Sequence, residues 1–178
     1  MKTRFIVFLI LICLGSVSHA SENGIRAGWQ IAATYNGLSR VNGPISGIYA
    51  GFYHISYPLG VKFIGIQSGL EFCQVGYRKD SENYRQQNYL GIPVSLRIKM
   101  GPIYLIGGIE GNVKITEKNV VNGSVVSDKS SFFDAHTHAG VGFKIGSFSI
   151  EGRYHQGLVD INKGNKTDYL QLGGTFTF

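Results

Sequence analysis

The sequence has little cysteine, little proline and no long apolar run. Its 178 residues include 2 cysteines and 4 prolines, and only Cys73 lies beyond the first twenty positions. A single cysteine cannot form an intramolecular disulfide, so the domain must draw its stability from elsewhere. The longest apolar run, Phe5–Leu14, is about half of the ~20 residues that a membrane-spanning helix needs. A helical membrane anchor is therefore excluded.

The start of the sequence has the features of a secretory signal peptide. Two basic residues, Lys2 and Arg4, precede the apolar run, and the small-x-small triplet Ser18-His19-Ala20 follows it. This order of basic, apolar and small residues predicts cleavage after Ala20. A lipoprotein signal does not fit, because Cys13 lies inside the apolar run. We therefore predict a signal peptide over residues 1–20 and one domain over residues 21–178.

The sequence also has only a small excess of charge of one sign. The formal net charge is +6, and removal of Lys2 and Arg4 with the signal peptide lowers it by two. The remaining lysines and arginines are dispersed and form neither a basic run nor a basic amphipathic helix. Binding to nucleic acid is not expected of an exported chain with this pattern.

Two adjoining segments alternate strictly between apolar and small or polar residues. The first is Leu90–Met100 and the second is Ile103–Ile115, and Met100-Gly101-Pro102 forms a break between them. A period of two in two segments joined by a turn predicts a β-hairpin. The apolar face could pack on the core of a soluble sandwich, or it could face lipid in the wall of a barrel.

The same alternation recurs and predicts eight strands, at about residues 24–36, 45–57, 61–77, 90–100, 103–115, 133–145, 148–158 and 168–178. Polar loops, among them 78–87 and 117–131, alternate with very short turns near Leu59, Gly101 and Gly146. Outer-membrane barrels have this asymmetry, with short periplasmic turns and longer outer loops. The 25 glycines suit strands that bend sharply. We predict an all-β, eight-stranded antiparallel up-and-down transmembrane β-barrel with both termini in the periplasm.

The faces opposite the apolar ones carry charges of both signs. Eight strands enclose a lumen just wide enough for side chains to fill, and a buried charge is costly unless it is paired. We therefore expect a network of charges that interlock across the lumen. Its members are Arg26, Glu71, Arg97, Lys99, Glu110, Lys114, His136, His138, Lys144, Glu151 and Arg153. The alternative is an ion path through the lumen.

The tripeptide His136-Thr137-His138 places two imidazoles on one strand face. A metal site needs three or four ligands, and His155 or Asp134 could supply more. On the sequence alone we expect neither a metal nor a cofactor.

Several segments carry a resemblance to a known family. They are Tyr89-Leu90-Gly91-Ile92-Pro93-Val94, Tyr104-Leu105-Ile106-Gly107-Gly108, Gly140-Val141-Gly142-Phe143, the segment 151–158 and the terminal Phe178. With these segments the chain resembles the small outer-membrane β-barrel proteins of the Bacteroidetes, the porin-family or PorT-like type. The resemblance implies an eight-stranded barrel in outer-membrane lipid and a C-terminal aromatic residue, Phe178, that the barrel-assembly machinery recognises. It implies no single shared activity.

An enzymatic role finds little support in the sequence. The segment Arg153-Tyr154-His155-Gln156-Gly157 is similar to a motif of outer-membrane lipid A deacylases, in which a serine stands two residues after the histidine. Here that position is Gly157, so the nucleophile is missing. The aromatic residues expected on the outer face suit interfacial girdles. They are Trp29, Tyr35, Tyr57, Phe148, Tyr154, Phe176 and Phe178.

These observations predict a non-enzymatic integral outer-membrane barrel. Its role would be structural or one of surface interaction through its extracellular loops, with an extracellular or periplasmic protein partner that the sequence does not identify. The alternative is a narrow porin-like channel for ions or small solutes. Both signs of charge occur on the inward face, which favours a closed lumen over a selective ring of one sign.

Overall fold

The computed structural model describes residues 21–36, 39–40, 42–58, 61–78, 82–126, 131–159 and 166–178. The signal peptide predicted over residues 1–20 lies outside this part of the chain, as do parts of the connections around residues 80, 128 and 163. No helix in the described ranges is long and apolar enough to cross a membrane.

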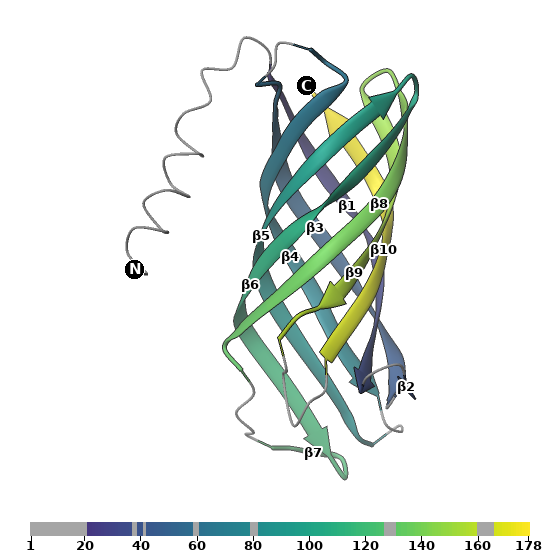
Figure 1. Cartoon of the computed structure of the whole chain (residues 1–178). Helices are drawn as coiled ribbons and strands as arrows, with labels where there is room; N and C mark the ends of the chain where they lie inside the picture. Colours follow the sequence, from purple (N-terminus) through teal and green to yellow (C-terminus); the bar gives the residue numbers. More distant parts are fainter. Residues whose placement is uncertain are drawn as a thin grey trace, which may run out of the picture.

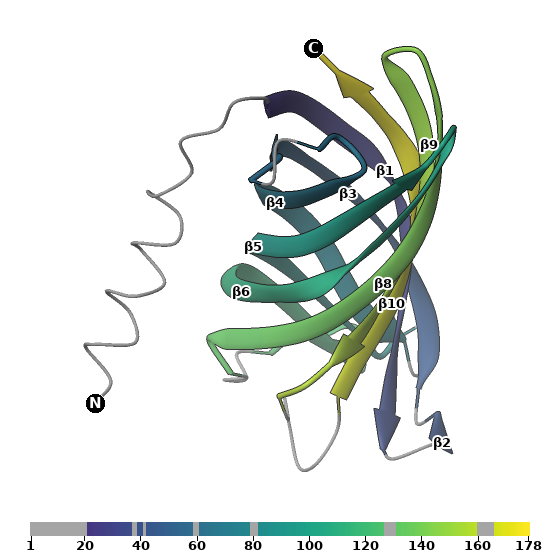
Figure 2. The same ribbon diagram turned by 45° about the horizontal axis from the view of Figure 1, so that its top comes forward.

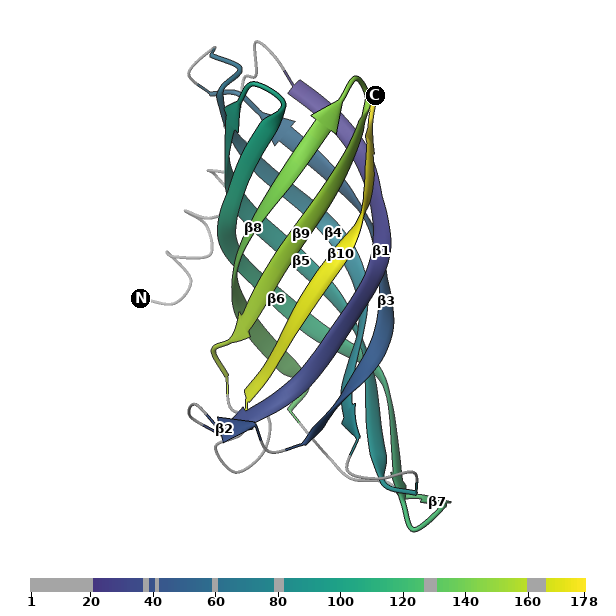
Figure 3. The ribbon, with the colours of Figure 1, turned by 90° about the vertical axis from the view of Figure 1, so that its right-hand side faces the viewer.

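The described residues form a closed antiparallel barrel of eight long strands, as predicted (Figure 1). The strands are β1 (Ser21–Asn36), β3 (Gly43–Ser56), β4 (Ile64–Arg78), β5 (Tyr84–Met100), β6 (Ile103–Val121), β8 (Phe133–Ile145), β9 (Phe148–Gly157) and β10 (Lys166–Thr177). Two short strands, β2 (Ser39–Arg40) and β7 (Ser124–Val125), pair with the ends of β1 and β6. Each long strand pairs with its neighbour in the chain, and β1 pairs with β10 to close the wall (Figure 3).

The wall has its apolar side chains outside and its polar side chains inside, the reverse of a soluble sandwich. On β5, Ile92 is 60% exposed on the outer face, whereas Arg97 is 1% exposed inside. The same alternation holds on every long strand, and the large exposed residues of the outer face are mostly apolar. Figure 2, seen partly from one end, shows the strands as a tilted cylinder. The inward side is polar, so the sandwich alternative is rejected.

Several strands extend further than the sequence predicted. β6 runs to Val121 and β5 begins at Tyr84, within segments expected to be loops, and the two remain paired from Tyr84 and Val120 onward. Pairing between neighbouring strands satisfies the backbone hydrogen bonds whatever the side chains are. Polar segments can therefore continue the wall beyond the belt of apolar residues on its outer face. A bulge at Ile115 then shifts the alternation, because Asn88 pairs with Thr116 and Tyr89 with Lys114. In Figure 3, β6 and β7 reach past the other strands at one end.

One aromatic assignment was wrong. Tyr57 was expected in the outer girdle, but it is 2% exposed and lies inside. It shares the alternation of Tyr49, Tyr53 and Ile55, which are also buried, so this face of β3 is the lumen face. By contrast, Trp29 is 73% exposed on the outer face, and Phe148 and Phe176 pack together with ring centroids 4.9 Å apart.

Glycines form the short turns at the other end of the barrel. Gly101 and Gly146 have φ values of 67° and 61°, in the left-handed region that only glycine adopts without strain. These turns lie at the same end as the C-terminus (Figure 1). β7 and the strand ends that flank the longer connections lie at the opposite end.

Candidate functional site

All eleven charged or histidine residues predicted to face inward line the lumen. Lys99, Lys114 and Lys144 are half-buried and the other eight are buried. With their partners they form four groups along the barrel axis. We name them the mouth cluster (Glu22, Tyr57, Lys99, Lys144), the central cluster (Arg26, Glu71, Arg97, Glu151, Arg153), the histidine cluster (Glu110, Asp134, His136, His138, His155) and the outer cluster (Arg85, Lys114, Glu117).

The central cluster links strands that are not neighbours. Nη2 of Arg153 on β9 lies 2.7 Å from Oε2 of Glu71 on β4, and its Nε lies 3.1 Å from Oε1 of Glu151. Arg26 on β1 lies 3.5 Å from Glu151 and 3.7 Å from Glu71. Both carboxylates are therefore shared by two guanidinium groups, which compensates the cost of burying each charge.

Tyrosines and glutamines complete the central cluster. Tyr104 donates to Oε2 of Glu151 at 2.8 Å, and Gln171 donates to Oε1 of Glu71 at 2.8 Å. The guanidinium carbon of Arg97 lies 3.5 Å from the ring centroid of Tyr104, a cation–π contact. Similar contacts join Arg26 to Tyr53 and Arg153 to Tyr49. The sequence analysis missed these aromatic partners, although they share the inward parity of the charges.

The mouth cluster is centred on Glu22, a residue that the predicted strand boundary left out. Its carboxylate accepts hydrogen bonds from Lys99 and Lys144, both at 2.9 Å, and from Tyr57 at 2.7 Å. Burial, together with the bond to Glu22, raises the pKa of the Tyr57 phenol, which therefore stays a neutral donor. These contacts close the end of the lumen near the short turns.

The outer cluster lies towards the long connections. Glu117 forms ion pairs with Arg85 and with Lys114. Arg85 and Glu117 were expected in loops, so the sequence analysis did not place them in the lumen. The bulge at Ile115 turns Glu117 inward.

Two histidines of the histidine cluster lie beside a carboxylate. Nδ1 of His155 lies 3.3 Å from Oε2 of Glu110, and the rings of His138 and His155 stack with centroids 5.0 Å apart. Tyr169 donates to Oε1 of Glu110 at 3.3 Å. His136 is engaged elsewhere, because its Nδ1 lies 3.0 Å from the amide of Asn112.

A serine–histidine pair occurs in the lumen that the sequence did not reveal. Oγ of Ser95 lies 2.7 Å from Nε2 of His138. In a catalytic triad a carboxylate orients the other ring nitrogen, but Nδ1 of His138 has no hydrogen-bond partner among the described residues. Ser95 is also 4% exposed, so a substrate has no direct access to it.

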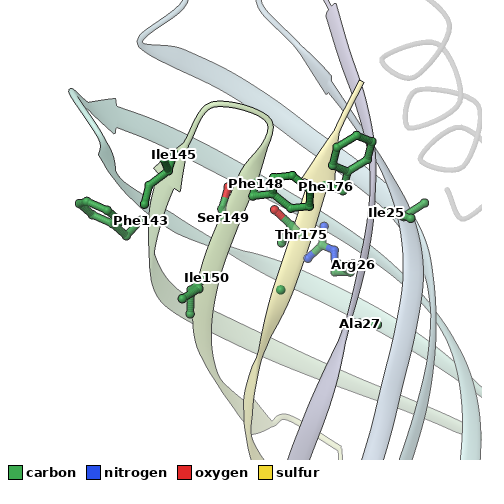
Figure 4. A pocket seen from close by; sticks show the side chains of 11 residues that line it. Ile25, Arg26, Ala27, Phe143, Ile145, Phe148, Ser149, Ile150, Thr175 and Phe176 are labelled. Carbon is green, nitrogen blue, oxygen red and sulfur yellow. The ribbon is translucent and has the colours of Figure 1, made fainter.

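A hollow lies on the outer face of the wall. It has a volume of about 560 Å³ and opens between β8, β9, β10 and β1 (Figure 4). Phe143, Ile150 and Phe176 are among the side chains around it, and Gly174 and Ala27 leave room in the wall. A hollow of this kind in the apolar belt suits an acyl chain of the surrounding lipid.

The chain was compared with protein families and known proteins. A family model described as outer membrane protein beta-barrel domain matches residues 16–163. No curated protein matches significantly.

Several solved structures have the same fold. Ail of Yersinia pestis, in complex with the heparin analogue sucrose octasulfate, is 14% identical with a TM-score of 0.58 over 89% of this chain and 99% of that chain. Neisserial surface protein A is 13% identical with a TM-score of 0.60 over 90% and 100%. OprG of Pseudomonas aeruginosa is 12% identical with a TM-score of 0.50 over 90% and 97%. At these identities the likeness shows the fold alone.

The central cluster predicts a large loss of stability when one charge is removed. Glu71→Gln leaves two guanidinium groups without their shared carboxylate, and we expect it to lower the free energy of unfolding by about 3–5 kcal/mol. Lys62→Gln also removes one charge, from an exposed residue, and its effect should stay within about 0.5 kcal/mol. Denaturant unfolding in phospholipid, followed by the fluorescence of the single tryptophan, Trp29, measures both. Equal effects of the two changes would contradict this prediction.

Proposed function

The chain belongs to the outer membrane protein beta-barrel domain family, and from this premise we propose that it is a non-enzymatic barrel with a closed lumen that acts through its extracellular loops. Membership places it in the outer membrane, in contact with lipid. Its role is structural or one of surface interaction with an extracellular or periplasmic partner.

The observation that carries this proposal is the filling of the lumen. Arg153, Glu71 and Glu151 are each at most 2% exposed, and their contacts join β9 to β4 across the barrel. An ion or solute passing this level would have to break several charge-assisted hydrogen bonds at once. This argues against the runner-up, a narrow porin-like channel, and leaves the loops as the working surface.

A second support comes from the wall beyond the apolar belt. On its outer face a polar ladder runs from Gln74 through Asn88 to Thr116, with hydrogen bonds of 3.2 and 2.8 Å. Beyond it, β5 and β6 continue to Tyr84 and Val121. The resulting projection is a rigid platform in water, which suits recognition better than a flexible loop does. The Ail structure holds a heparin analogue, a precedent for ligand binding by a barrel of this fold.

We propose three finer assignments. The Bacteroidetes PorT-like type is supported by the strand and turn segments that carry the resemblance. Recognition of Phe178 by the barrel-assembly machinery is supported by the exposure of this aromatic residue directly after β10, where it is 67% exposed. The absence of enzymatic activity is supported by Gly157 at the position of a serine and by the incomplete surroundings of the Ser95–His138 pair.

The closed lumen predicts the electrical behaviour of the purified barrel. In planar bilayers the wild-type protein should show no steady conductance. Arg97→Ala or Glu110→Ala should open one, because each removes a large buried side chain from the lumen. Glu82→Ala, outside the lumen, is the control and should stay closed. A stable open channel of the wild type would refute the proposal and establish the pore.

The orientation predicts which end can be reached from outside the cell. Cys73 is 1% exposed, so it gives little background in cysteine labelling. A membrane-impermeant maleimide should label Asn122→Cys, at the tip beyond β6, on intact cells. Ser147→Cys, in a short turn, should react only after the outer membrane is permeabilised. The opposite result would place both termini outside the cell.

A further inference from the structure

Three side chains from three neighbouring strands converge in the lumen with the chemistry of metal ligands. Glu110 on β6, His138 on β8 and His155 on β9 each offer one ligand atom, and these atoms lie within 4.8 Å of one another. The register explains the convergence, because His138 pairs directly with His155, and Glu110 pairs with His136, two residues before His138. The sequence suggested the two histidines of β8, with His155 or Asp134 as further ligands. The structure brings His138 and His155 together and adds a carboxylate of β6 in place of His136.

Several polar atoms at this point lack a well-formed hydrogen bond. Among the described residues, Nδ1 of His138 and Nε2 of His155 accept or donate none, and Oε2 of Glu110 and Nδ1 of His155 have only their mutual 3.3 Å contact. The three residues are at most 4% exposed. An unsatisfied buried polar atom costs about 1–3 kcal/mol, so several of them at one point indicate a ligand that accepts their lone pairs.

Charge leads to the same conclusion. In the central cluster each carboxylate is bound by arginines. Among the described residues, the ion pairs of Glu110 and Asp134 in the histidine cluster are with His155 and His136 and not with any lysine or arginine. Both carboxylates also accept a hydrogen bond from a neutral donor, Glu110 from Tyr169 and Asp134 from the backbone N–H of Ala135, but buried carboxylates without a lysine or arginine partner call for a cation. A divalent ion supplies the missing charge.

We propose that Glu110, His138 and His155 bind a Zn²⁺ ion in the lumen. Two imidazoles and one carboxylate are a ligand set of zinc, with a fourth position for water. Imidazole nitrogen makes the site unsuited to Ca²⁺ and Mg²⁺, which prefer oxygen ligands. Ligand atoms of a tetrahedral zinc site lie about 3.3 Å apart for bonds of about 2.0–2.1 Å, so modest rotations of the three side chains close the site.

Ser95 is a positioning residue for this site. Its Oγ bonds Nε2 of His138 at 2.7 Å, which leaves Nδ1 of that ring to face the ion. A partner on the far nitrogen fixes the tautomer and direction of a metal-binding imidazole. The bound ion would link β6, β8 and β9. This inference is independent of the proposed function, because a conducting barrel could hold the same ion.

The first test measures zinc retention. The tag-free barrel is refolded in detergent with Zn²⁺, passed over a desalting column equilibrated with chelator-treated buffer, and analysed by elemental mass spectrometry. We expect about one ion per wild-type barrel and less than a tenth of that in His155→Gln and Glu110→Gln. His54→Gln is the control, because His54 lies on the outer face, where it bonds Asn23, and its retention should match the wild type. Absence of zinc in the wild type, or equal retention by wild type and His155→Gln, would overturn the proposal.

The second test does not depend on the folding of the variants. Wild-type barrel loaded with Co²⁺ in place of Zn²⁺ should show the intense visible absorption of four-coordinate cobalt. Its absence, with only the weak spectrum of hydrated cobalt, would contradict the site even if some zinc were retained.

Ser95→Ala should keep the cobalt band but lower the affinity for the ion roughly 10–100-fold, as expected of a residue that orients a ligand. An unchanged affinity would remove Ser95 from the site.

Discussion

The constraint on which this structure depends is that a charge inside an eight-stranded barrel has to be paired. Eight strands leave a lumen just wide enough for side chains to fill, and an isolated carboxylate or guanidinium buried there would cost several kcal/mol. The central cluster meets this constraint by sharing Glu71 and Glu151 between Arg26 and Arg153. The partners come from strands on different sides of the barrel, so the pairing also ties the wall together across the lumen. The outer face needs no such ties, because lipid accepts its apolar side chains.

The sequence predicted the features that follow from a period of two. Which residue faces lipid and which faces the lumen depends only on position along a strand, so Leu90 and Ile92 were placed outside and Arg97 inside before any coordinates were considered. The count of eight strands followed from the same pattern. Short turns could be predicted in the same way, because the alternation breaks at Gly101 and restarts after it.

The sequence could not predict which inward residues meet. Contacts across the lumen depend on the stagger of the strands, which a period of two does not contain, so Glu22 was left out and the partners of Arg153 were unknown. Strand ends were also misjudged at Arg85 and Glu117, because polar residues predict loops in soluble proteins but continue the wall of a barrel in water. Tyr57 was placed outside although it shares the alternation of Tyr49 and Tyr53, because an aromatic face was taken for the lipid side and these tyrosines instead line the lumen.

The barrel has a paired interior and a projecting end. Pairing runs along the lumen from the mouth cluster at the short turns to the outer cluster, and a metal ion in the histidine cluster would add one more link among β6, β8 and β9. Under the proposed function, the projecting end of β5, β6 and β7 is the surface left for interaction.

The most direct test of the central claim is a double-mutant cycle on Glu71 and Arg153, measured as the free energy of unfolding in phospholipid. If pairing is the constraint, Glu71→Gln and Arg153→Met should each be strongly destabilising, and the double variant should lose clearly less than their sum, with a coupling of about 1–3 kcal/mol. Losses that add to within about 0.5 kcal/mol would show that the two charges act independently and would contradict the account.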